Sequence, residues 1–201
     1  MTLNEAEETA AMIELLTPRL RLRPAAPDDV DAIHAIMREP RAMRYWSTPP
    51  HDSLEQTRAW LQSMIDTPAA EGEDFVVEHE GRVIGKAGLY RFPEIGFIFH
   101  PDVWGRGFAR EALDAVIQRG LAVHELPAIE ADVDPRNIAS LRLLASLGFV
   151  EIRRAERTWQ VGDEWCDSVY LGLNEATYQA AAAHPTSKAL GEATAKAGLA
   201  Q

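Results

Sequence analysis

The stretch from Glu94 to Arg110, EIGFIFHPDVWGRGFAR, decides the fold of this chain. Apolar residues alternate up to Phe99 and stop at Pro101, which predicts a strand followed by a turn. Gly105 and Gly107 then open a helical pattern, and glycines at the start of a helix let several backbone N–H groups face outward together. Because a helix N-terminus adds about half a positive charge, we expect this turn to bind an anion, most often phosphate.

Other interpretations compete for this turn. A Walker A loop would read G-x-x-x-x-G-K-[ST], and the chain contains no such string. A dinucleotide fingerprint would read G-x-G-x-x-G/A, but Arg110 occupies its third glycine position. The remaining alternative is a glycine-rich turn that only joins a strand to a helix. A second element further along the chain favours the binding interpretation.

That second element is NIASLRLLASLGF, residues 137–149, which follows an apolar stretch from Ala128 to Val133. Together with EIGFIFHPDVWGRGFAREAL, it resembles the GNAT superfamily of acetyl-CoA-dependent N-acetyltransferases, and especially the Rim-type branch that acetylates the N-termini of ribosomal proteins. RLRLRPAAPDDVDAI and YWSTPPHDSLEQTRAWL are also similar to that branch. The resemblance runs from about Thr17 to Leu173. It implies direct transfer of an acetyl group from acetyl-CoA to the primary amine of a protein N-terminus or a small molecule.

The elements that we expect run strand, two helices, three strands, helix, strand, helix and two strands, followed by an Ala-rich helix. This order predicts an α/β fold with a mixed six- to seven-stranded sheet and helices on both faces. The resemblance implies the GNAT fold, with a V-shaped cofactor cleft between the Glu94 strand and the Ala128 strand. We expect an acidic leader over residues 1–16, a single N-acetyltransferase domain over residues 17–184 and a flexible tail over residues 185–201.

Shorter signals mark individual helices. Ser53 with Gln56 is a capping-box pattern and predicts a helix to about Ile65. Pro40 is expected to close the preceding helix, and Gly148 to cap the end of the helix that begins after Asn137.

Composition limits the class of partner. The chain has 201 residues and a formal net charge of −11, which argues against a dedicated nucleic-acid binder and suits a cationic partner, although an acidic surface is also simply a soluble one. Cys166 is the one cysteine, and no apolar run approaches the roughly 18 residues of a spanning helix. We expect a cytoplasmic monomer or homodimer with no membrane partner. The histidine spacings predict no metal site.

The resemblance also implies which residues hold acetyl-CoA. The predicted cofactor-binding residues are Phe97, Ile98, Phe99, Trp104, Gly105, Arg106, Gly107, Phe108, Ala109, Arg110, Asn137 and Ser140. Trp104 stands where the family pattern Q/R-x-x-G-x-G/A has Gln or Arg. For Arg106 and Arg110 a solvent-facing helix charge is an equal alternative. Asn137 could contact the pantetheine arm, cap the next helix, or do both.

Three catalytic residues follow from the same resemblance. Glu94 is expected to deprotonate the acceptor amine, with an exposed strand-end carboxylate as the alternative. The backbone N–H of Ile98 is expected to polarise the thioester carbonyl. Leu144 occupies the position where many family members have a tyrosine that protonates the thiolate, so Ser140 is the predicted substitute, with a first-turn helix serine as its alternative.

The acceptor pocket is expected to involve Tyr45, Trp46 and His51, which lie in a loop rich in aromatic residues and proline. Packing is the alternative role for these side chains. A CoA-binding regulatory module without efficient turnover is the alternative function, because the usual tyrosine is missing. A nucleotide-phosphate binder that uses the glycine turn is a third possibility.

Overall fold

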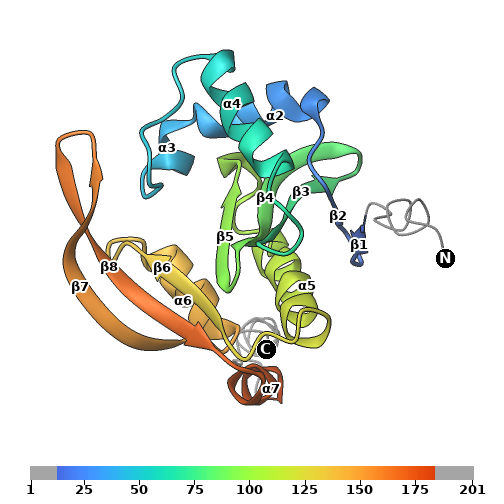
Figure 1. Ribbon diagram of the computed structural model, residues 1–201, viewed down its shortest axis with the longest axis vertical. Helices are drawn as coiled ribbons and strands as arrows, with labels where there is room; N and C mark the ends of the chain where they lie inside the picture. The colour runs from blue at the N-terminus through green and yellow to red at the C-terminus, as the bar shows by residue number, and fades with distance from the viewer. Residues whose placement is uncertain (1–12, 184–201) are drawn as a thin grey trace, which may run out of the picture.

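The protein folds around one eight-stranded sheet, seen in a computed structural model that describes residues 13–183 (Figure 1). The strand order is β1-β2-β3-β4-β5-β6-β8-β7. The strands are β1 (Leu15–Leu16), β2 (Arg21–Arg23), β3 (Glu73–His79), β4 (Arg82–Arg91), β5 (Glu94–Phe99), β6 (Ile129–Val133), β7 (Val150–Val161) and β8 (Glu164–Leu173). Neighbouring strands are antiparallel except for β5 and β6, which are parallel. The predicted mixed α/β sheet is therefore confirmed.

The helical elements lie in the connections between these strands, except for α7, which follows the last strand. They are η1 (Pro27–Asp29), α2 (Val30–Met37), α3 (Pro40–Met43), α4 (Leu54–Ile65), η2 (Pro101–Val103), α5 (Phe108–Ala122), α6 (Ile138–Ser146) and α7 (Glu175–Ala183). Within residues 13–183, every helix is too short or too polar to span a membrane.

The eighth strand corrects the predicted number of six to seven. Leu15 and Leu16 pair with Leu22 and Arg21 of β2, although the sequence places them in the leader. Two residues, of which Leu16 is 76% exposed, are too few to give a detectable alternation. The rest of the predicted leader and the predicted tail, residues 1–12 and 185–201, lie outside the described residues.

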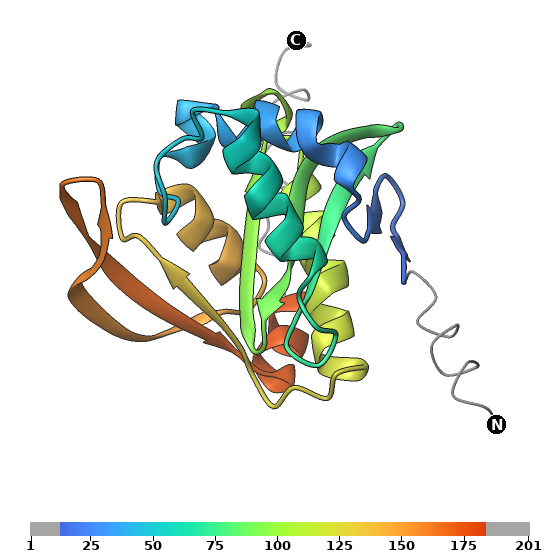
Figure 2. The same ribbon diagram turned by 45° about the horizontal axis from the view of Figure 1, so that its top comes forward.

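Helices cover both faces of the sheet, as Figure 2 shows for α4 in front and α5 behind. The larger apolar cluster joins the sheet to α5 and α6, with Phe99 and Leu113 among its members. The smaller cluster joins the sheet to α2 and α4, where Ile36 and Leu61 pack with Ile98. Successive residues of β5 therefore face opposite helical layers, as strand geometry requires.

Local capping explains where the helices on one face begin. Ser53 Oγ accepts the N–H of Gln56 at 3.2 Å, which confirms the predicted start of α4. Pro40, which the sequence predicts only as the end of the preceding helix, is also the first residue of the short helix α3. Proline is favoured there, since the first helical N–H has no partner within the helix.

Candidate active site

The strands β5 and β6 diverge and leave a gap in the middle of the sheet. Along these two fully described strands the parallel register pairs only Glu94 with Glu130. Beyond that point lies a cavity of about 110 Å³. Its lining residues are Tyr45, Trp46, Ile95, Gly96, Phe97, Ala131, Asp132, Val133, Asp134, Asn137, Ser140 and Leu144. The V-shaped cleft that the family resemblance implies is present, and it opens toward the C-terminal ends of both strands.

The peptide groups at the end of β5 show which amides face this gap. The N–H of His100 donates to Ile84 O on β4 at 2.9 Å. A Cβ placed on Gly85 of β4 would lie 2.5 Å from the carbonyl oxygen of Ile98. Peptide groups alternate in direction along a strand. Even-numbered residues of β5 therefore turn their backbone polar groups toward β4.

Odd-numbered residues turn their backbone polar groups toward β6. The N–H of Glu130 on β6 donates to the carbonyl oxygen of Pro93, the residue just before β5, at 3.0 Å. The amides of Phe97 and Phe99 thus face the gap, and the amide of Ile98 does not. The prediction that the Ile98 N–H polarises a thioester carbonyl does not fit this geometry. The Phe97 amide, already expected to hold the cofactor, is the donor that the structure directs into the gap.

The turn between β5 and α5 has the geometry that the sequence predicts. Gly105 and Gly107 have φ values of +73° and +79°, and Gly107 is the N-cap of α5. Residues 104–107 are all exposed. The indole N–H of Trp104 donates to Phe99 O at 2.9 Å, which fastens the turn to the end of β5. The exposed N–H groups at the start of α5 can therefore receive an anion.

Three of the residues expected at the turn have side chains that contact other parts of the protein. The Phe108 side chain is 2% exposed and belongs to the core, so only its backbone can face a ligand. The Arg106 guanidinium lies 4.7 Å from the centre of the Phe108 ring. Arg110 donates to Ser146 O at 3.0 Å, which ties α5 to the last residue of α6. The alternative for Arg110, a solvent-facing charge on the helix, describes this exposed side chain better than a phosphate contact, because Ser146 already accepts its hydrogen bond.

The opposite wall of the gap comes from α6. Asn137 is the N-cap of this helix, and its Oδ1 accepts the N–H of Ser140 at 3.2 Å. Both residues line the small cavity, so the amide group of Asn137 can cap the helix and still present its NH₂ to a ligand. Leu144, at the position of the missing tyrosine, is fully buried and also lines the cavity.

A second cavity, of about 390 Å³, lies between the sheet, α4 and the β7–β8 hairpin. It shares six lining residues with the gap: Tyr45, Trp46, Ile95, Gly96, Asp132 and Asp134. Trp60, Ser63 and Met64 of α4 line it from one side, and Cys166 and Ser168 of β8 from the other. This cavity opens onto the gap from the α4 side of the sheet, and we call it the acceptor pocket after the site that the sequence predicts around Tyr45 and Trp46.

Two of the three predicted acceptor residues line this pocket. Tyr45 and Trp46 do, and His51 does not. His51 is 5% exposed, and its Nδ1 lies 2.9 Å from Thr57 Oγ1 on α4. Nδ1 of His34 on α2 lies 2.7 Å from the same hydroxyl. Packing, the alternative role for His51, is the one that the structure supports.

The predicted base Glu94 lies at the closed end of the gap. Its carboxylate is ion-paired with Arg91 and accepts a hydrogen bond from the Tyr90 hydroxyl. Glu94 is absent from the residues that line either cavity. Burial and the hydrogen bond to Glu94 raise the pKa of Tyr90 well above its usual range. The structure therefore places Glu94 beside the site and engages it with two neighbours.

Sequence reasoning missed the residues that form the floor and the acidic wall of the pocket. Asp74 of β3 and Lys86 of β4 form a buried ion pair with Nζ 2.6 Å from Oδ2. Asp132, Asp134, Glu164 and Asp167 add carboxylates from β6, β8 and the loop after β6. The sequence signal for the floor is a lysine inside the apolar strand VIGKAGL, since an unpaired lysine is rarely buried.

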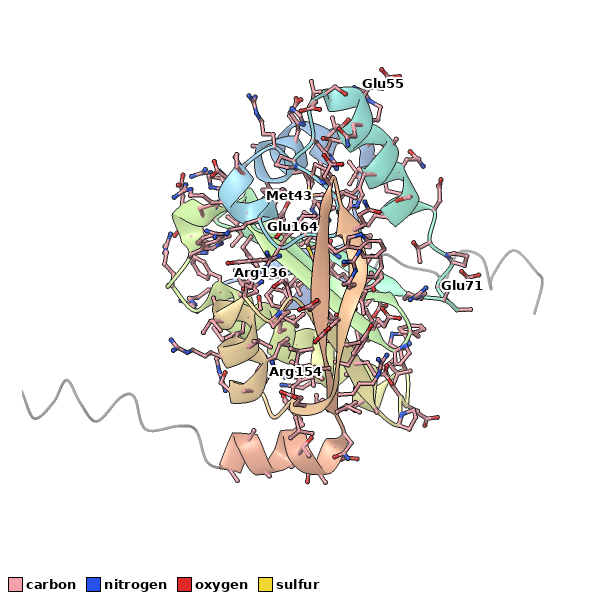
Figure 3. The ribbon with its side chains drawn as sticks, turned by 90° about the vertical axis from the view of Figure 1, so that its left-hand side faces the viewer. Met43, Glu55, Glu71, Arg136, Arg154 and Glu164 are labelled. Atoms are coloured by element: carbon pink, nitrogen blue, oxygen red, sulfur yellow. The ribbon has the colours of Figure 1, made fainter. Side chains whose placement is uncertain are left out.

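Part of the acidic wall is neutralised by Arg136. This guanidinium contacts Asp134 at 2.6 Å and also pairs with Glu164, and Figure 3 shows Arg136 and Glu164 close to each other. Although burial alone would raise it, the hydrogen bonds from Arg136 hold the pKa of Asp134 below its usual range. Asp132 and Asp167 are different, because neither has an ion-pair partner among residues 13–183.

Comparisons with known proteins agree with this geometry. Residues 19–150 match the family described as acetyltransferase (GNAT) domain. An uncharacterized N-acetyltransferase, p20, from Bacillus licheniformis is 33% identical over 148 residues, which cover 69% of this chain and 83% of p20. The spermidine N(1)-acetyltransferase of Escherichia coli (strain K12) is 26% identical over 138 residues, 65% of this chain and 72% of that protein.

Solved structures show the same fold. The spermidine N-acetyltransferase from Vibrio cholerae, in complex with CoA and spermine, superposes with a TM-score of 0.70 at 23% identity, covering 81% of this chain and 99% of that one. RimL, a ribosomal L7/L12 alpha-N-protein acetyltransferase, superposes with a TM-score of 0.73 at 16% identity, covering 81% and 94%. The chain therefore belongs to the GNAT acetyltransferase family and is an N-acetyltransferase.

Proposed function

We propose that this enzyme transfers an acetyl group from acetyl-CoA directly to a small primary amine that carries further positive charge. The proposal rests on the size and the lining of the acceptor pocket. Its volume of about 390 Å³ lies within the range of small-molecule sites, roughly 300–1,000 Å³. Its walls combine aromatic side chains with carboxylates, a combination that suits an alkylammonium ion.

The charge of the pocket supports a cationic acceptor. Asp132 of β6 and Asp167 of β8 face the pocket without an ion-pair partner in the described part of the chain. Their oxygens accept neutral donors instead: the Trp159 indole at 2.9 Å and the Arg157 backbone N–H at 2.9 Å. Two uncompensated carboxylates near a concave surface attract cations. The formal net charge of −11 also favours the approach of a cationic acceptor.

Relatives named as spermidine acetyltransferases support the same class of acceptor. A protein N-terminus is the second candidate, favoured by the sequence resemblance to the Rim-type branch. A regulatory module without turnover would bind CoA and acetylate neither class. These functions differ in one assay, because each predicts a different set of productive acceptors.

The residues that would hold acetyl-CoA follow from the geometry of the gap. The amides of Phe97 and Phe99 face it, and the turn that runs from Gly105 into the start of α5 would offer backbone N–H groups to the pyrophosphate. Asn137 offers its NH₂ to the pantetheine arm. Ser140 offers a hydroxyl to the sulfur that leaves, in place of the missing tyrosine. Bound acetyl-CoA supplies the activated acetyl group.

An acceptor screen tests the proposal. Purified protein with acetyl-CoA is offered spermidine, a monoamine of similar length and peptides that begin with Ser, Ala or Met, and thiol release and product mass are measured. We expect spermidine to give the highest kcat/KM. Asp132→Asn should raise KM for spermidine about tenfold, equivalent to about 1.4 kcal/mol, and change KM for the monoamine less. Preference for the peptides would support the second candidate, and CoA binding without any transfer would support the regulatory module.

A further inference from the structure

The floor of the acceptor pocket contains an ion pair that the proposed reaction does not yet use. Asp74 and Lys86 have side chains that are 6% and 3% exposed, and both line the pocket. The Lys86 ammonium also lies 5.7 Å from the centre of the Trp46 ring and 5.5 Å from that of Tyr90. The pair is therefore a fixed part of the pocket and not a surface contact.

One oxygen of this pair has no partner. Oδ2 of Asp74 is held by Lys86 at 2.6 Å, but Oδ1 is buried and accepts no hydrogen bond from residues 13–183. A buried carboxylate oxygen normally has a donor, and an exception calls for an explanation. Asp74 lines the pocket, so an acceptor amine that enters the pocket comes next to this carboxylate.

A glycine on β4 makes the space for the carboxylate of this pair, and a glycine on β5 lies beside its ammonium group. A Cβ on Gly88 of β4 would lie 2.5 Å from Asp74 Oδ1, so any side chain there would displace the carboxylate. A Cβ on Gly96 of β5 would lie 3.5 Å from Lys86 Nζ. Gly96 lines both the gap and the acceptor pocket. The ion pair thus lies next to the residue where the two cavities meet.

The other carboxylates around the pocket, and the Tyr90 hydroxyl, already have hydrogen-bond or ion-pair partners. Tyr90, on the same strand as Lys86, donates to Glu94. Asp134 and Glu164 are paired with Arg136. Asp132 and Asp167 accept neutral donors, and Arg44 at the end of α3 contributes a further cation to the lining. Among these carboxylates Asp74 alone combines burial with an oxygen that lacks a donor.

We propose that Asp74 is the general base that takes the proton from the acceptor amine, and that Lys86 is the residue that positions its carboxylate. This inference rests on the proposed acetyl transfer. Burial raises the pKa of Asp74, and the neighbouring ammonium offsets part of that rise. A carboxylate with a raised pKa is a better proton acceptor than an exposed one.

The proton balance of the step is simple. The acceptor arrives as an ammonium ion, and Asp74 Oδ1 takes one of its protons, which frees the nitrogen lone pair. The nitrogen forms the C–N bond to the acetyl carbonyl carbon, and the C–S bond breaks. The nitrogen loses a second proton, which ends on the released thiolate. Asp74 then returns its proton to solvent, so an ammonium ion and acetyl-CoA give an amide, CoA thiol and one proton.

The test compares Asp74→Asn with the wild-type enzyme over a range from about pH 6 to about pH 11, using acceptors whose amines have pKa values near 8 and near 10.4. A peptide α-amine and spermidine are the two probes. We expect Asp74→Asn to lower kcat/KM about 10²-fold at the acidic end of the range. The loss should shrink above about pH 8 with the peptide and only above about pH 10 with spermidine, since free amine then needs no base.

Glu73→Gln is the matched control. Glu73 is the neighbouring residue of β3 and is also a partly buried carboxylate, but it pairs with Arg119 of α5 at 2.7 Å on the opposite face of the sheet. This variant should keep the wild-type pH profile. CoA affinity should stay unchanged in both variants, which shows that the cofactor site is folded. If Asp74→Asn does not fold, Asp74→Asn with Lys86→Met removes both buried charges and should show the same pH-dependent loss.

Three results would overturn the inference. One is wild-type kcat/KM in the folded variant, and another is an equal loss at every pH, which would indicate positioning alone. The third is a loss that depends on pH in the same way for both probes. If the wild-type enzyme binds CoA but acetylates neither probe nor any other amine of the screen, the proposed function fails, which is a separate outcome.

Discussion

Lys86 Nζ lies 2.6 Å from Asp74 Oδ2 across two neighbouring strands, in a pocket that is open to an acceptor. Pairs of this kind contribute little net stability, because the cost of removing two charges from water offsets their attraction. Removing one partner is different, since the other charge stays buried and unpaired. The stability of variants that lack one or both of these charges can therefore be predicted.

We expect Lys86→Met to lower the free energy of unfolding by about 3–5 kcal/mol. Adding Asp74→Asn to this variant should recover most of that loss, because no buried charge then remains. Chemical denaturation of the two variants and the wild-type protein measures both effects. A double variant that is less stable than Lys86→Met would contradict this account of the pair.

The sequence predicts features that depend on near neighbours in the chain. The turn at Gly105 and Gly107 and the cap at Ser53 are local, because residues within four positions determine them. The order of strands and helices follows from periodicity, which is also local. These parts of the fold, and the location of the cofactor turn, could therefore be predicted without a structure.

The parts that the sequence did not predict depend on contacts between distant segments. Which amides of β5 face the gap depends on the pairing of that strand with β4, so Ile98 and Phe97 cannot be distinguished by sequence alone. Asp74 and Lys86 are 12 positions apart and meet only because β3 and β4 are paired. The role of His51 depends in the same way on Thr57 and on the packing of α2 against α4.

His51 should make the fold less stable in acid. Burial lowers the pKa of His51, with a smaller contribution from the charge of His34. Because the folded pKa lies below the unfolded value of about 6.5, the unfolded chain binds the proton more readily. Stability is then fully present above that pH and is lost as the pH falls through it toward the folded pKa.

Thermal unfolding at several pH values measures this effect. The wild-type melting temperature should fall between about pH 7 and about pH 5, and His51→Asn should show a shallower fall over the same range. Thr57→Val removes the shared hydroxyl but keeps both histidines, so it should lower the melting temperature at every pH. An equally steep fall in His51→Asn would assign the acid sensitivity to other groups.

Glu94→Gln separates the two candidate bases. The sequence predicts that this change lowers kcat/KM by roughly 10²-fold, with a loss that shrinks at high pH. Because Glu94 is engaged by Arg91 and Tyr90 outside both cavities, we expect instead a small loss that is the same at every pH. Stability should change by less than about 1 kcal/mol, since Arg91 is 67% exposed.

The same rate measurements decide between these outcomes. A large loss in Glu94→Gln that disappears above the pKa of the acceptor amine would assign the proton transfer to Glu94. Wild-type behaviour of Glu94→Gln beside a pH-dependent loss in Asp74→Asn would assign it to Asp74. The two variants thus test the sequence-based and the structure-based assignments in one experiment.

Gly107→Val tests the role of the turn in binding CoA. Gly107 has a φ of +79°, a conformation that a β-branched residue rarely adopts, and it caps the helix whose N–H groups face outward. Gly81, in the turn between β3 and β4, is the matched control, because its φ is +74° and a Cβ there would meet nothing within 4 Å. Both valines impose similar backbone strain, so both should lower stability by a similar amount. Calorimetric titration should show CoA affinity reduced at least about tenfold in Gly107→Val and unchanged in Gly81→Val. Wild-type affinity in a folded Gly107→Val protein would mean that the pyrophosphate binds elsewhere, whereas an equal loss in both variants would attribute the effect to strain and not to the turn.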